Sequence, residues 1–527
     1  MVCISPLIMV FYGLGKSCVL RGICLKLEAP CLPKAKSPQN SMRPMAAGAN
    51  WIAGTVELSS KVRYGLTSRG VPLFRFIPYD KRLAPFAVGC SCRDLFYNIH
   101  AIAEPLPVAD AKSKSMPRAS IVQTLGAPSM TTEMAMLIAT YAHDSRKELR
   151  KFPEQLFDEP VRKPRLTYPH PTFHIDPPGC RDVDDTFSFV AHTDGTWEVG
   201  IHIADVASVI PEGSPLDLHA ASLSTSFYDP NGRVVQSMLP PDLSESSSSL
   251  LPSDPPQPKP TLSLFFSFDG KAVTDIHWMR TLTTTTLSYT YDEASCSPPY
   301  VLPALAKTLG SKADDTHDAH KWVERMMIFY NEQAAILLAS RRAGILRRHS
   351  PPAAAKLKAL LAIPGVPDFL AYQAAEYCLS TDADTTHYGL ERAVYAYASS
   401  PLRRYADLVN QRAIHAILDD IDPPRQNPTL IAELNRRQRQ AKDFSRDLFF
   451  MSILKQGDTV SEGTVVTAPT KDLLIWKTKV WVPAWQRTIT ARSTEPPTIA
   501  AGAAVSITWY YRHDAPNWKE RMVFQLK

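Results

Sequence analysis

The alternation of hydrophobic and polar residues along the chain predicts both strands and helices. Residues 196–205 alternate with a period of two, which places Val199, Ile201 and Ile203 on one side of a strand and His202 on the other. Later in the chain, hydrophobic residues recur with the spacing of amphipathic helices. The central region is therefore expected to contain both strands and helices. The predicted helices span residues 322–342, 357–362 and 430–454.

The regions on either side of this central part have a different pattern, with short strand-like runs. Between residues 51 and 105, these runs are separated by glycine and proline, which favours a small β-barrel. Residues 459–527 are rich in Val, Thr, Trp and Tyr, which predicts a second barrel. The aromatic run 509–511 fits ordinary strand positions there, with stacking on bases as the alternative. Residues 119–141 lead from the first barrel into the central region.

Length and composition are those of a globular protein with several domains. The chain has 527 residues, of which 45% are hydrophobic, and this length corresponds to about three to four domains. The formal net charge of +6 is small for this size, so composition permits nucleic-acid binding without indicating it. The nine cysteines show no paired metal-ligand spacing, and their odd number favours a reducing compartment. We therefore expect an intracellular, cytoplasmic protein without disulfides.

Residues 1–45 differ from the rest of the chain and are expected to form a leader. They contain one acidic residue, Glu28, and a hydrophobic run at 7–14 that is too short to cross a bilayer. A secretory signal would require a positive charge before this run, and the chain has none there. Organelle targeting, an unstructured leader and a later start at Met42 or Met45 all remain open. No membrane association is expected.

Four aspartates lie within ten residues, at Asp176, Asp182, Asp184 and Asp185. Two carboxylates about 4 Å apart repel by roughly 4 kcal/mol at an effective dielectric near 20, so a group of them needs protons, solvent or a cation. The Pro-Pro-Gly sequence at 177–179 predicts a stiff, tight loop that folds the first carboxylate back toward the others. An all-oxygen site of this kind suits Mg²⁺ or Mn²⁺.

The aspartates have other interpretations as well. A solvated acidic turn is the simplest, because Asp, Pro and Gly are common loop residues. Residues 182–186 resemble the nucleophile motif of haloacid-dehalogenase-type phosphatases, but that motif follows an apolar strand, and here Gly-Cys-Arg at 179–181 precedes it. An EF-hand loop beginning at Asp176 would need glycine and glutamate where the chain has Arg181 and Phe187.

An arginine-rich segment supplies a candidate phosphate contact. Ser400 as N-cap and Pro401 at the first helical position predict a helix that runs toward Leu418. Arg403 then lies in the first turn, where a cation opposes the helix dipole. Such an arginine is better placed to hold an anion, and phosphate is the natural candidate. A pair between Arg403 and Asp407 on a solvated face is the alternative.

Taken together, these segments resemble the catalytic domain of the RNB family, the ribonuclease II and ribonuclease R exoribonucleases. The resemblance spans about residues 160–455 and depends on the order of several short motifs. They are the aspartate stretch at 174–189, the strand at 199–206, Met-Leu-Pro-Pro-Asp-Leu-Ser at 238–244, Leu-Ser-Tyr-Thr-Tyr-Asp-Glu at 287–293, His-Tyr-Gly-Leu at 387–390 and Ser-Ser-Pro-Leu-Arg-Arg-Tyr-Ala-Asp at 399–407.

The resemblance implies an α+β fold in which an RNB catalytic domain is flanked by small OB-type β-barrels. In family members, cold-shock-type barrels precede the catalytic domain and guide single strands. The expected divisions are the leader (1–45), an OB or cold-shock-like barrel (46–110), a connecting segment (111–159), the RNB catalytic domain (160–455) and a C-terminal OB-like barrel (456–527).

The resemblance also implies a 3′ to 5′ exoribonuclease that hydrolyses single-stranded RNA to nucleoside 5′-monophosphates, and we expect a monomer. In the family the aspartates hold divalent metal, so Asp176, Asp182, Asp184 and Asp185 take that role, with Mg²⁺ as the ion and Mn²⁺ as the alternative. Asp184 and Asp185 would lie nearest the attacking water. Arg403 would stabilise the charge that develops on the phosphoryl oxygens.

RNA contacts follow from the same resemblance. It assigns stacking near the terminal nucleotide to Tyr291 and a second aromatic contact to Tyr228, with half-buried core positions as the alternative for both. Arg403 and Arg404 are assigned to phosphate. Further basic runs lie in or beside the same region, although solvated helix faces are expected to account for at least half of them. These runs are at residues 341–342, 347–349, 403–404 and 436–439.

Some features depart from the family. On the helix at 430–454 the family often has a glutamate that contacts RNA, and alignment places Lys442 there, which would contact phosphate instead. Residues 244–260 are longer and richer in proline than expected and are interpreted as a loop insertion. His202 and His387 are interpreted as structural. The main alternative function is a catalytically silent RNB-fold RNA-binding protein, against which the four aspartates and Arg403 argue.

Overall fold

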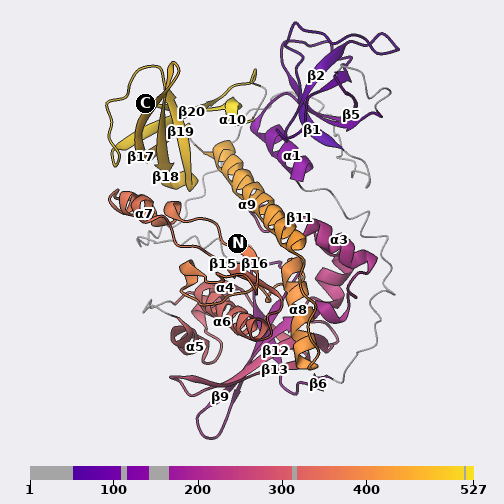
Figure 1. Cartoon of the computed structure of the whole chain (residues 1–527), viewed down its shortest axis with the longest axis vertical. Helices are drawn as coiled ribbons and strands as arrows, with labels where there is room; N and C mark the ends of the chain where they lie inside the picture. Colours follow the sequence, from indigo (N-terminus) through magenta and orange to yellow (C-terminus); the bar gives the residue numbers. More distant parts are fainter. Residues whose placement is uncertain (1–50, 108–115, 142–164, 311–316, 458, 516–517) are drawn as a thin grey trace, which may run out of the picture.

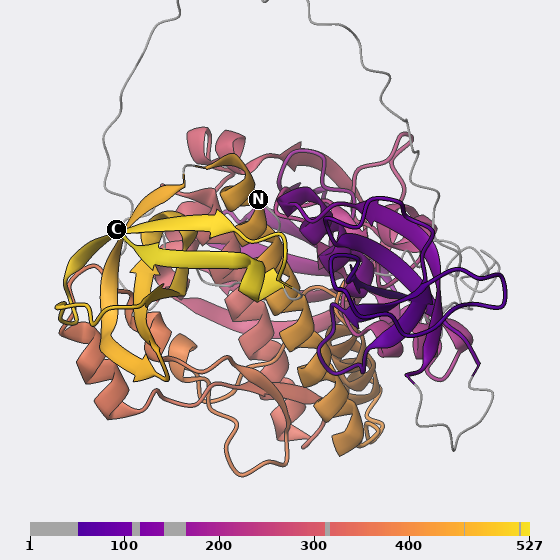
Figure 2. The ribbon, with the colours of Figure 1, turned by 90° about the horizontal axis from the view of Figure 1, so that it is seen from above.

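The computed structural model describes residues 51–107, 116–141, 165–310, 317–457, 459–515 and 518–527. These residues form two closed five-stranded barrels and, between them in the sequence, a mixed domain on a seven-stranded sheet. The barrels lie beside each other at one end of the molecule, and the sheet domain forms the other end (Figures 1 and 2). The predicted α+β architecture is therefore confirmed. The expected leader, residues 1–45, lies outside the described residues.

The first barrel has the strand order β1-β2-β3-β5-β4, which is that of an OB-type barrel. Side chains such as Val56, Phe76 and Val88 fill its interior. Its fifth strand lies in the segment 111–159 that the sequence pattern assigns to a connection, so the barrel ends at Gly126 and not near residue 110. Only the long-range pairing of β5 with β3 and β4 shows this. The strands are β1 (Ile52–Val56), β2 (Leu73–Pro78), β3 (Phe86–Gly89), β4 (Ile99–Pro105) and β5 (Arg118–Gly126).

The second barrel has the equivalent order, β17-β18-β19-β21-β20. Its aromatic run behaves as strand residues do, because Trp509 and Tyr511 pack against the barrel core while Tyr510 between them is exposed. A barrel at the end of the chain is thus confirmed. Its elements are β17 (Val460–Asp472), β18 (Ile475–Val482), the 3₁₀ turn η6 (Pro483–Trp485), β19 (Arg487–Ser493), β20 (Ala504–Tyr511), α10 (Trp518–Arg521) and β21 (Met522–Leu526).

The central domain is built on a sheet with the strand order β14-β7-β8-β9-β12-β13-β6. Phe187, Ile201 and Leu264 lie in register on three neighbouring strands, and all are fully buried. Burial of such a side chain stabilises the fold by about 1.5–3 kcal/mol. The strands are β6 (Leu166–Thr167), β7 (Thr172–Ile175), β8 (Asp185–Ala191), β9 (Trp197–Ala204), β12 (Lys259–Phe268), β13 (Val273–Thr283) and β14 (Thr285–Tyr289).

Alternate residues of β9 point to the opposite face of this sheet, and His202 among them is fully buried. Its imidazole is bonded to Ser188 Oγ at 2.9 Å and to Ser263 Oγ at 2.7 Å. Burial lowers the pKa of His202 to about 3, so the ring is neutral. The interpretation of this histidine as a structural residue is confirmed.

Helices α6 and α8 pack on the hydrophobic face of the sheet (Figure 1). Trp322 and Tyr330 of α6 and Ile414 of α8 belong to the same core as the sheet residues. The three helices expected from periodicity are all present, as α6, α7 and α9. The helices are α3 (Pro215–Leu223), α4 (Tyr291–Cys296), α5 (Leu302–Leu309), α6 (Ala319–Ser340), α7 (Ala354–Leu361), α8 (Tyr405–Leu418) and α9 (Pro428–Gln456). Shorter elements are η2 (Val206–Ser208), β10 (Phe227–Tyr228), β11 (Val234–Gln236), η3 (Leu243–Ser247), β15 (Ile345–Arg348), η4 (Asp368–Ala371), β16 (Glu376–Leu379) and η5 (Tyr388–Leu390).

Helix α1 (Met130–Tyr141) joins the two barrels through a buried polar network. Glu133 on α1 is 0% exposed and accepts hydrogen bonds from Tyr511 Oη at 2.7 Å and from Arg521. Arg521 belongs to the second barrel and also donates to Thr55 Oγ1 of the first, at 3.4 Å. One buried ion pair therefore links α1 with both barrels.

None of the helices in the described ranges is long and apolar enough to span a membrane. The cytoplasmic location and the monomeric state stay predictions.

Candidate functional site

The aspartate segment forms a tight loop between β7 and β8, as its sequence predicts. Asp176 follows β7 directly, and its N–H donates to Tyr289 O at 3.1 Å, which extends the parallel pairing with β14. The chain then turns, with Cys180 N donating to Pro177 O at 3.1 Å. Gly179 has a φ of +81°, a left-handed conformation that favours glycine. This turn brings the chain back so that β8 begins at Asp185.

Ser249 holds the second half of this loop. Its hydroxyl donates to Arg181 O at 2.6 Å and accepts from Val183 N at 3.1 Å, and Leu250 N donates to Val183 O at 2.9 Å. The segment 244–260, interpreted from sequence as a loop insertion, therefore supports the aspartates on either side of Val183.

All four aspartates line one cavity of about 570 Å³, together with Tyr228 and Arg403. These residues come from the loop before β8, from β10 and from the segment before α8. The structure thus brings together most of the site residues expected from sequence. The rest of the wall is formed by residues 177–181 and 231–234 and by Glu245.

Asp176 is oriented by a histidine that sequence reasoning left without a function. His174 Nδ1 donates to Asp176 Oδ2 at 2.8 Å, and His174 Nε2 lies 2.6 Å from Ser288 Oγ on β14. Two residues that are two positions apart on a strand lie on the same face. The His-Ile-Asp spacing was therefore a signal for this pair.

Tyr228 contacts the second aspartate. Its hydroxyl donates to Asp182 Oδ2 at 2.6 Å. Burial and the nearby carboxylate raise the pKa of Tyr228 well above its ordinary value, so the phenol keeps its proton. This hydrogen bond fixes the ring at the cavity wall.

Asp184 is bound by donors from the segment before α8. Its Oδ1 accepts from Leu402 N at 2.9 Å, and its Oδ2 accepts from Arg403 Nε, also at 2.9 Å. Ser400 Oγ accepts a further bond from Arg403 Nη2 at 2.8 Å. Burial raises the pKa of Asp184 to about 7, although Arg403 acts to lower it. Arg403 therefore faces an aspartate directly.

The neighbouring Asp185 is 6% exposed. Burial, together with the charges of Asp176 and Asp184, raises its pKa well above the ordinary value. The carboxylates are thus close enough to repel, and a cation placed among them would relieve that repulsion.

The donor set fits a hard divalent cation, but the four expected ligands do not converge on one point. Asp176, Asp182 and Asp185 offer carboxylate oxygens at the same cavity, which is the chemistry that Mg²⁺ and Mn²⁺ prefer. Both oxygens of Asp184 are already bonded. Among the described residues, no three His, Cys, Asp or Glu side chains are arranged to hold an ion.

The helix that carries the arginines begins later than the sequence predicts. The segment expected to be its first turn forms a separate turn, in which Arg404 N donates to Ser400 O at 3.0 Å. Helix α8 starts at Tyr405 with Arg404 at the N-cap position, so Ser400 is not the cap. Tertiary backbone bonds compete with helical ones here, because Arg403 O accepts from Ser226 N at 3.0 Å and Tyr405 N donates to Ser224 O at 2.9 Å. The predicted end at Leu418 is correct.

Two predicted RNA contacts lie outside the cavity wall. The ring of Tyr291 is buried and stacks on His320, with centroids 3.8 Å apart. Arg404 is also buried, and its Nη2 donates to Asp407 Oδ1 at 2.6 Å. Their contacts with RNA stay predictions, and for Tyr291 the buried core position is the arrangement that the structure has.

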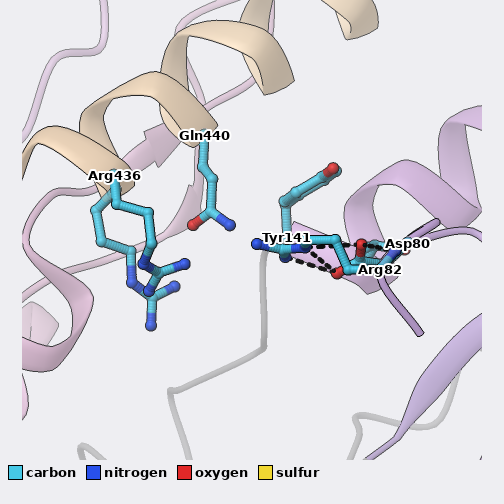
Figure 3. A pocket seen from close by; sticks show the side chains of 7 residues that line it. Asp80, Arg82, Tyr141, Arg436 and Gln440 are labelled. Carbon is cyan, nitrogen blue, oxygen red and sulfur yellow. Dashed lines mark hydrogen bonds and ion pairs between the residues drawn. The ribbon is translucent and has the colours of Figure 1, made fainter. Parts of the chain in front are cut away.

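Figure 3 shows a smaller cavity, of about 140 Å³, where the first barrel and α1 meet α9. Its arginines already have acidic partners: Arg82 bonds to Asp80, and Arg436 and Arg437 bond to Glu433. None of the four aspartates lines it. This cavity lacks the acidic chemistry of the larger one.

Comparison with known proteins identifies the central domain. The family model of the RNB domain matches residues 166–296 and 303–420, which include all four aspartates and Arg403. The chain therefore contains an RNB domain. The chain is 26% identical over 356 residues to the exosome complex exonuclease dis3 of Schizosaccharomyces pombe, in a match that covers 51% of this chain and 36% of the relative. It spans less than two thirds of the length of the first curated relatives that it matches.

Solved structures with RNB domains share the fold across both barrels. The apo form of Mycoplasma genitalium RNase R has a TM-score of 0.66 at 14% identity, with 90% of each chain covered. Yeast Ssd1, described as a pseudonuclease, has a TM-score of 0.61 at 17% identity, with 85% of this chain and 65% of that chain covered. The RNB fold with flanking OB-type barrels is thus confirmed, and it occurs both in an RNase and in a pseudonuclease.

Proposed function

We propose that this chain is a 3′ to 5′ exoribonuclease that hydrolyses single-stranded RNA to nucleoside 5′-monophosphates, acting as a monomer. The observation that carries the proposal is the single cavity lined by four aspartates, Tyr228 and Arg403. Similarity to exoribonucleases supports it. A site with four carboxylates and a guanidinium has the components of metal-assisted phosphodiester hydrolysis.

Asp176, Asp182, Asp184 and Asp185 would hold the divalent cation, Mg²⁺ or Mn²⁺. When bound, such an ion lowers the pKa of water and offsets negative charge at the phosphate. Because Asp184 is bonded to Arg403 in this structure, an entering phosphate would compete with Asp184 for the guanidinium. That exchange would free Asp184 for the cation and place Arg403 against the phosphoryl oxygens, where it stabilises developing charge.

Tyr228 would contact the RNA end. Its hydroxyl is held by Asp182, so its ring is fixed at the cavity wall before substrate enters. Stacking on a base is worth about 1–3 kcal/mol and does not depend on which base it is. The site would therefore accept any RNA sequence.

A catalytically silent RNA-binding protein is the second candidate. Two observations favour it: the direct bond between Arg403 and Asp184, and the lack, among the described residues, of three His, Cys, Asp or Glu side chains arranged to hold an ion. The shared fold of a pseudonuclease shows that this architecture is compatible with such a function. The two candidates differ in whether RNA is shortened.

Incubation of the full chain with 5′-labelled single-stranded RNA, with Mg²⁺ or with EDTA, separates them. We expect shortening from the 3′ end with Mg²⁺ alone. Asp184→Asn and Asp185→Asn should lower the rate by about 10²-fold or more while RNA affinity is retained, because charge stabilisation at the transition state is lost. Asp242→Asn is the matched control, since Asp242 is exposed and its side chain makes no cap bond. Tight binding without shortening would establish the silent protein instead.

A further inference from the structure

Three basic side chains of the central domain, Arg347, Arg404 and Lys442, are called the basic cluster here, and Arg404 directly follows the cavity residue Arg403 in the chain. Arg347 on β15 is 1% exposed and Arg404 is 7% exposed, while Lys442 on α9 is half-buried. Arg347 and Arg404 are therefore not among the basic residues that lie on solvated helix faces. Buried cations of this kind need a compensating partner.

Arg347 and Arg404 meet around one aromatic ring, that of Tyr397. The guanidinium carbons of Arg347 and Arg404 lie 4.2 Å and 4.0 Å from its centroid. Lys442 lies one helical turn along α9 from Gln438, which accepts a hydrogen bond from Arg347 at 2.9 Å. Burial acts to raise the pKa of Tyr397, but Arg347, Arg404 and Lys442 together lower it. Burial and the charge of Arg347 likewise lower the pKa of Lys442. The cluster is therefore compact enough for its members to act on the same groups.

The cluster has more positive charge than its acidic partners balance. Arg404 pairs with Asp407 at 2.6 Å. Within the described residues, the hydrogen bonds of Arg347 go to neutral oxygens, Gln438 Oε1 at 2.9 Å and Ala375 O at 3.0 Å. Lys442 forms no salt bridge with any of the described residues. About two positive charges thus stay uncompensated, which is unfavourable inside a protein unless an anion binds there.

Several buried donors in the cluster also have no hydrogen-bond partner within the part of the chain that the structure describes. They are Arg347 Nε and both Nε and Nη1 of Arg404. Buried N–H groups are nearly always satisfied, so a group of unsatisfied donors indicates a ligand with several acceptor oxygens.

The cluster adjoins the catalytic cavity. Arg404 follows Arg403 in the chain, and its charge, together with that of Arg403, acts on Asp185. Arg403 faces the cavity, whereas Arg404 is turned toward Tyr397 and Asp407. An anion at the basic cluster would therefore be a close neighbour of a phosphate at the aspartates.

We propose that the basic cluster binds a second phosphate group of the RNA, next to the one held at the aspartates. The proposal rests on the proposed function, because an RNA strand supplies phosphates in series and each offers oxygens to guanidinium and ammonium donors. The phosphate has two sources, an internal phosphodiester or a phosphate at the 3′ end.

Lys442→Gln tests the proposal without removing a fully buried arginine. Affinity for fluorescent single-stranded RNA is measured by anisotropy in EDTA over a range of salt concentrations. We expect about a tenfold loss of affinity, and the slope of log K against log salt should fall by about 0.7, as for one lost phosphate contact on a single strand. Lys455→Gln is the matched control, because Lys455 is exposed and lies about 20 Å further along α9.

Two otherwise identical RNAs, one with a 3′-hydroxyl and one with a 3′-phosphate, identify the source. If Lys442→Gln loses affinity equally for both RNAs, the bound group is an internal phosphodiester. If it loses affinity only for the RNA with the 3′-phosphate, the bound group is the terminal phosphate. If Lys442→Gln matches Lys455→Gln in affinity and slope with both RNAs, the cluster proposal is overturned while cleavage by the wild type stands. If the wild type binds neither RNA, the proposed function itself fails, and the cluster proposal fails with it.

Discussion

At the scale of single residues, burial decides what each polar group in this protein does. Asp184 is 4% exposed and is bonded to Leu402 and Arg403, so its carboxylate organises the segment before α8 as well as facing the cavity. His202 is equally removed from solvent but has two serine partners and no charge nearby. The first environment suits a reactive group, and the second suits a structural one.

His202 gives a prediction about stability and pH. Its pKa falls from the ordinary 6.5 to about 3 in the folded protein, so between these values the unfolded chain binds a proton that the folded chain does not. Stability from this residue is complete above pH 6.5 and is lost as pH falls toward 3. Between about pH 7 and pH 5, the free energy of unfolding should fall by about 2 kcal/mol through His202 alone.

Urea unfolding of the wild type and of His202→Gln at pH 7 and at pH 5 measures this fall in the free energy of unfolding. The variant should be less stable than the wild type at neutral pH. Its free energy of unfolding should fall less than that of the wild type between pH 7 and pH 5, because it lacks the imidazole of His202. His192→Gln, an exposed histidine of the same domain, should retain the full pH dependence of the wild type. An unchanged pH dependence in His202→Gln would show that the ring is protonated in the folded protein.

At the scale of elements, contacts with distant segments set the boundaries that local sequence leaves open. Ser400 and Pro401 have the right types to begin a helix, yet α8 begins at Tyr405 because the preceding residues bond across to the segment before β10. The segment 244–260 looks like a plain insertion, yet its Ser249 holds the aspartate loop. Local propensity is a weak prior where tertiary bonds compete.

Ser249→Ala should therefore affect both stability and catalysis. It removes the acceptor for the buried Val183 N and the donor to Arg181 O, and an unsatisfied buried group costs about 1–3 kcal/mol. Cleavage should slow because Asp182 and Asp184 lie on either side of Val183. Ser246→Ala is the matched control, since Ser246 is exposed in the same segment. Unfolding and RNA cleavage that match this control would show that Ser249 does not hold the loop.

At the scale of the whole molecule, one buried ion pair links the two barrels and α1. Glu133 and Arg521 are 0% and 1% exposed, and Tyr511 and Thr55 complete the network from the two barrels. A buried pair of this kind adds little over a hydrophobic replacement, but removal of one member leaves a buried charge without its partner.

Arg521→Met should consequently destabilise the protein by about 3–5 kcal/mol, and the double substitution Glu133→Gln with Arg521→Met should recover much of that loss. Denaturant unfolding of the two single variants and the double variant gives the coupling energy. Arg512→Met is the control, because Arg512 pairs with Asp514 in an exposed ion pair of the same barrel and its loss should cost less than about 1 kcal/mol. Additive effects of the two substitutions would show that the barrels are not coupled through this pair.

The sequence by itself determined the elements and the chemistry. Alternation around Ile201 and helical periodicity in α6 and α9 predicted those elements, because side-chain period is a local property of the backbone. The density of aspartates predicted a shared acidic site, because like charges at short spacing need a compensating ion. The order of motifs predicted the RNB domain.

Tertiary structure alone decided which of these groups meet. The pairing of Arg403 with Asp184, of His174 with Ser288 and of β5 with β3 each joins segments far apart in the chain, so no local pattern reports it. Tyr291 turns into the core and Arg347 is buried beside Tyr397 for the same reason. Distances between remote residues depend on how the elements pack, and packing depends on the complete set of buried surfaces.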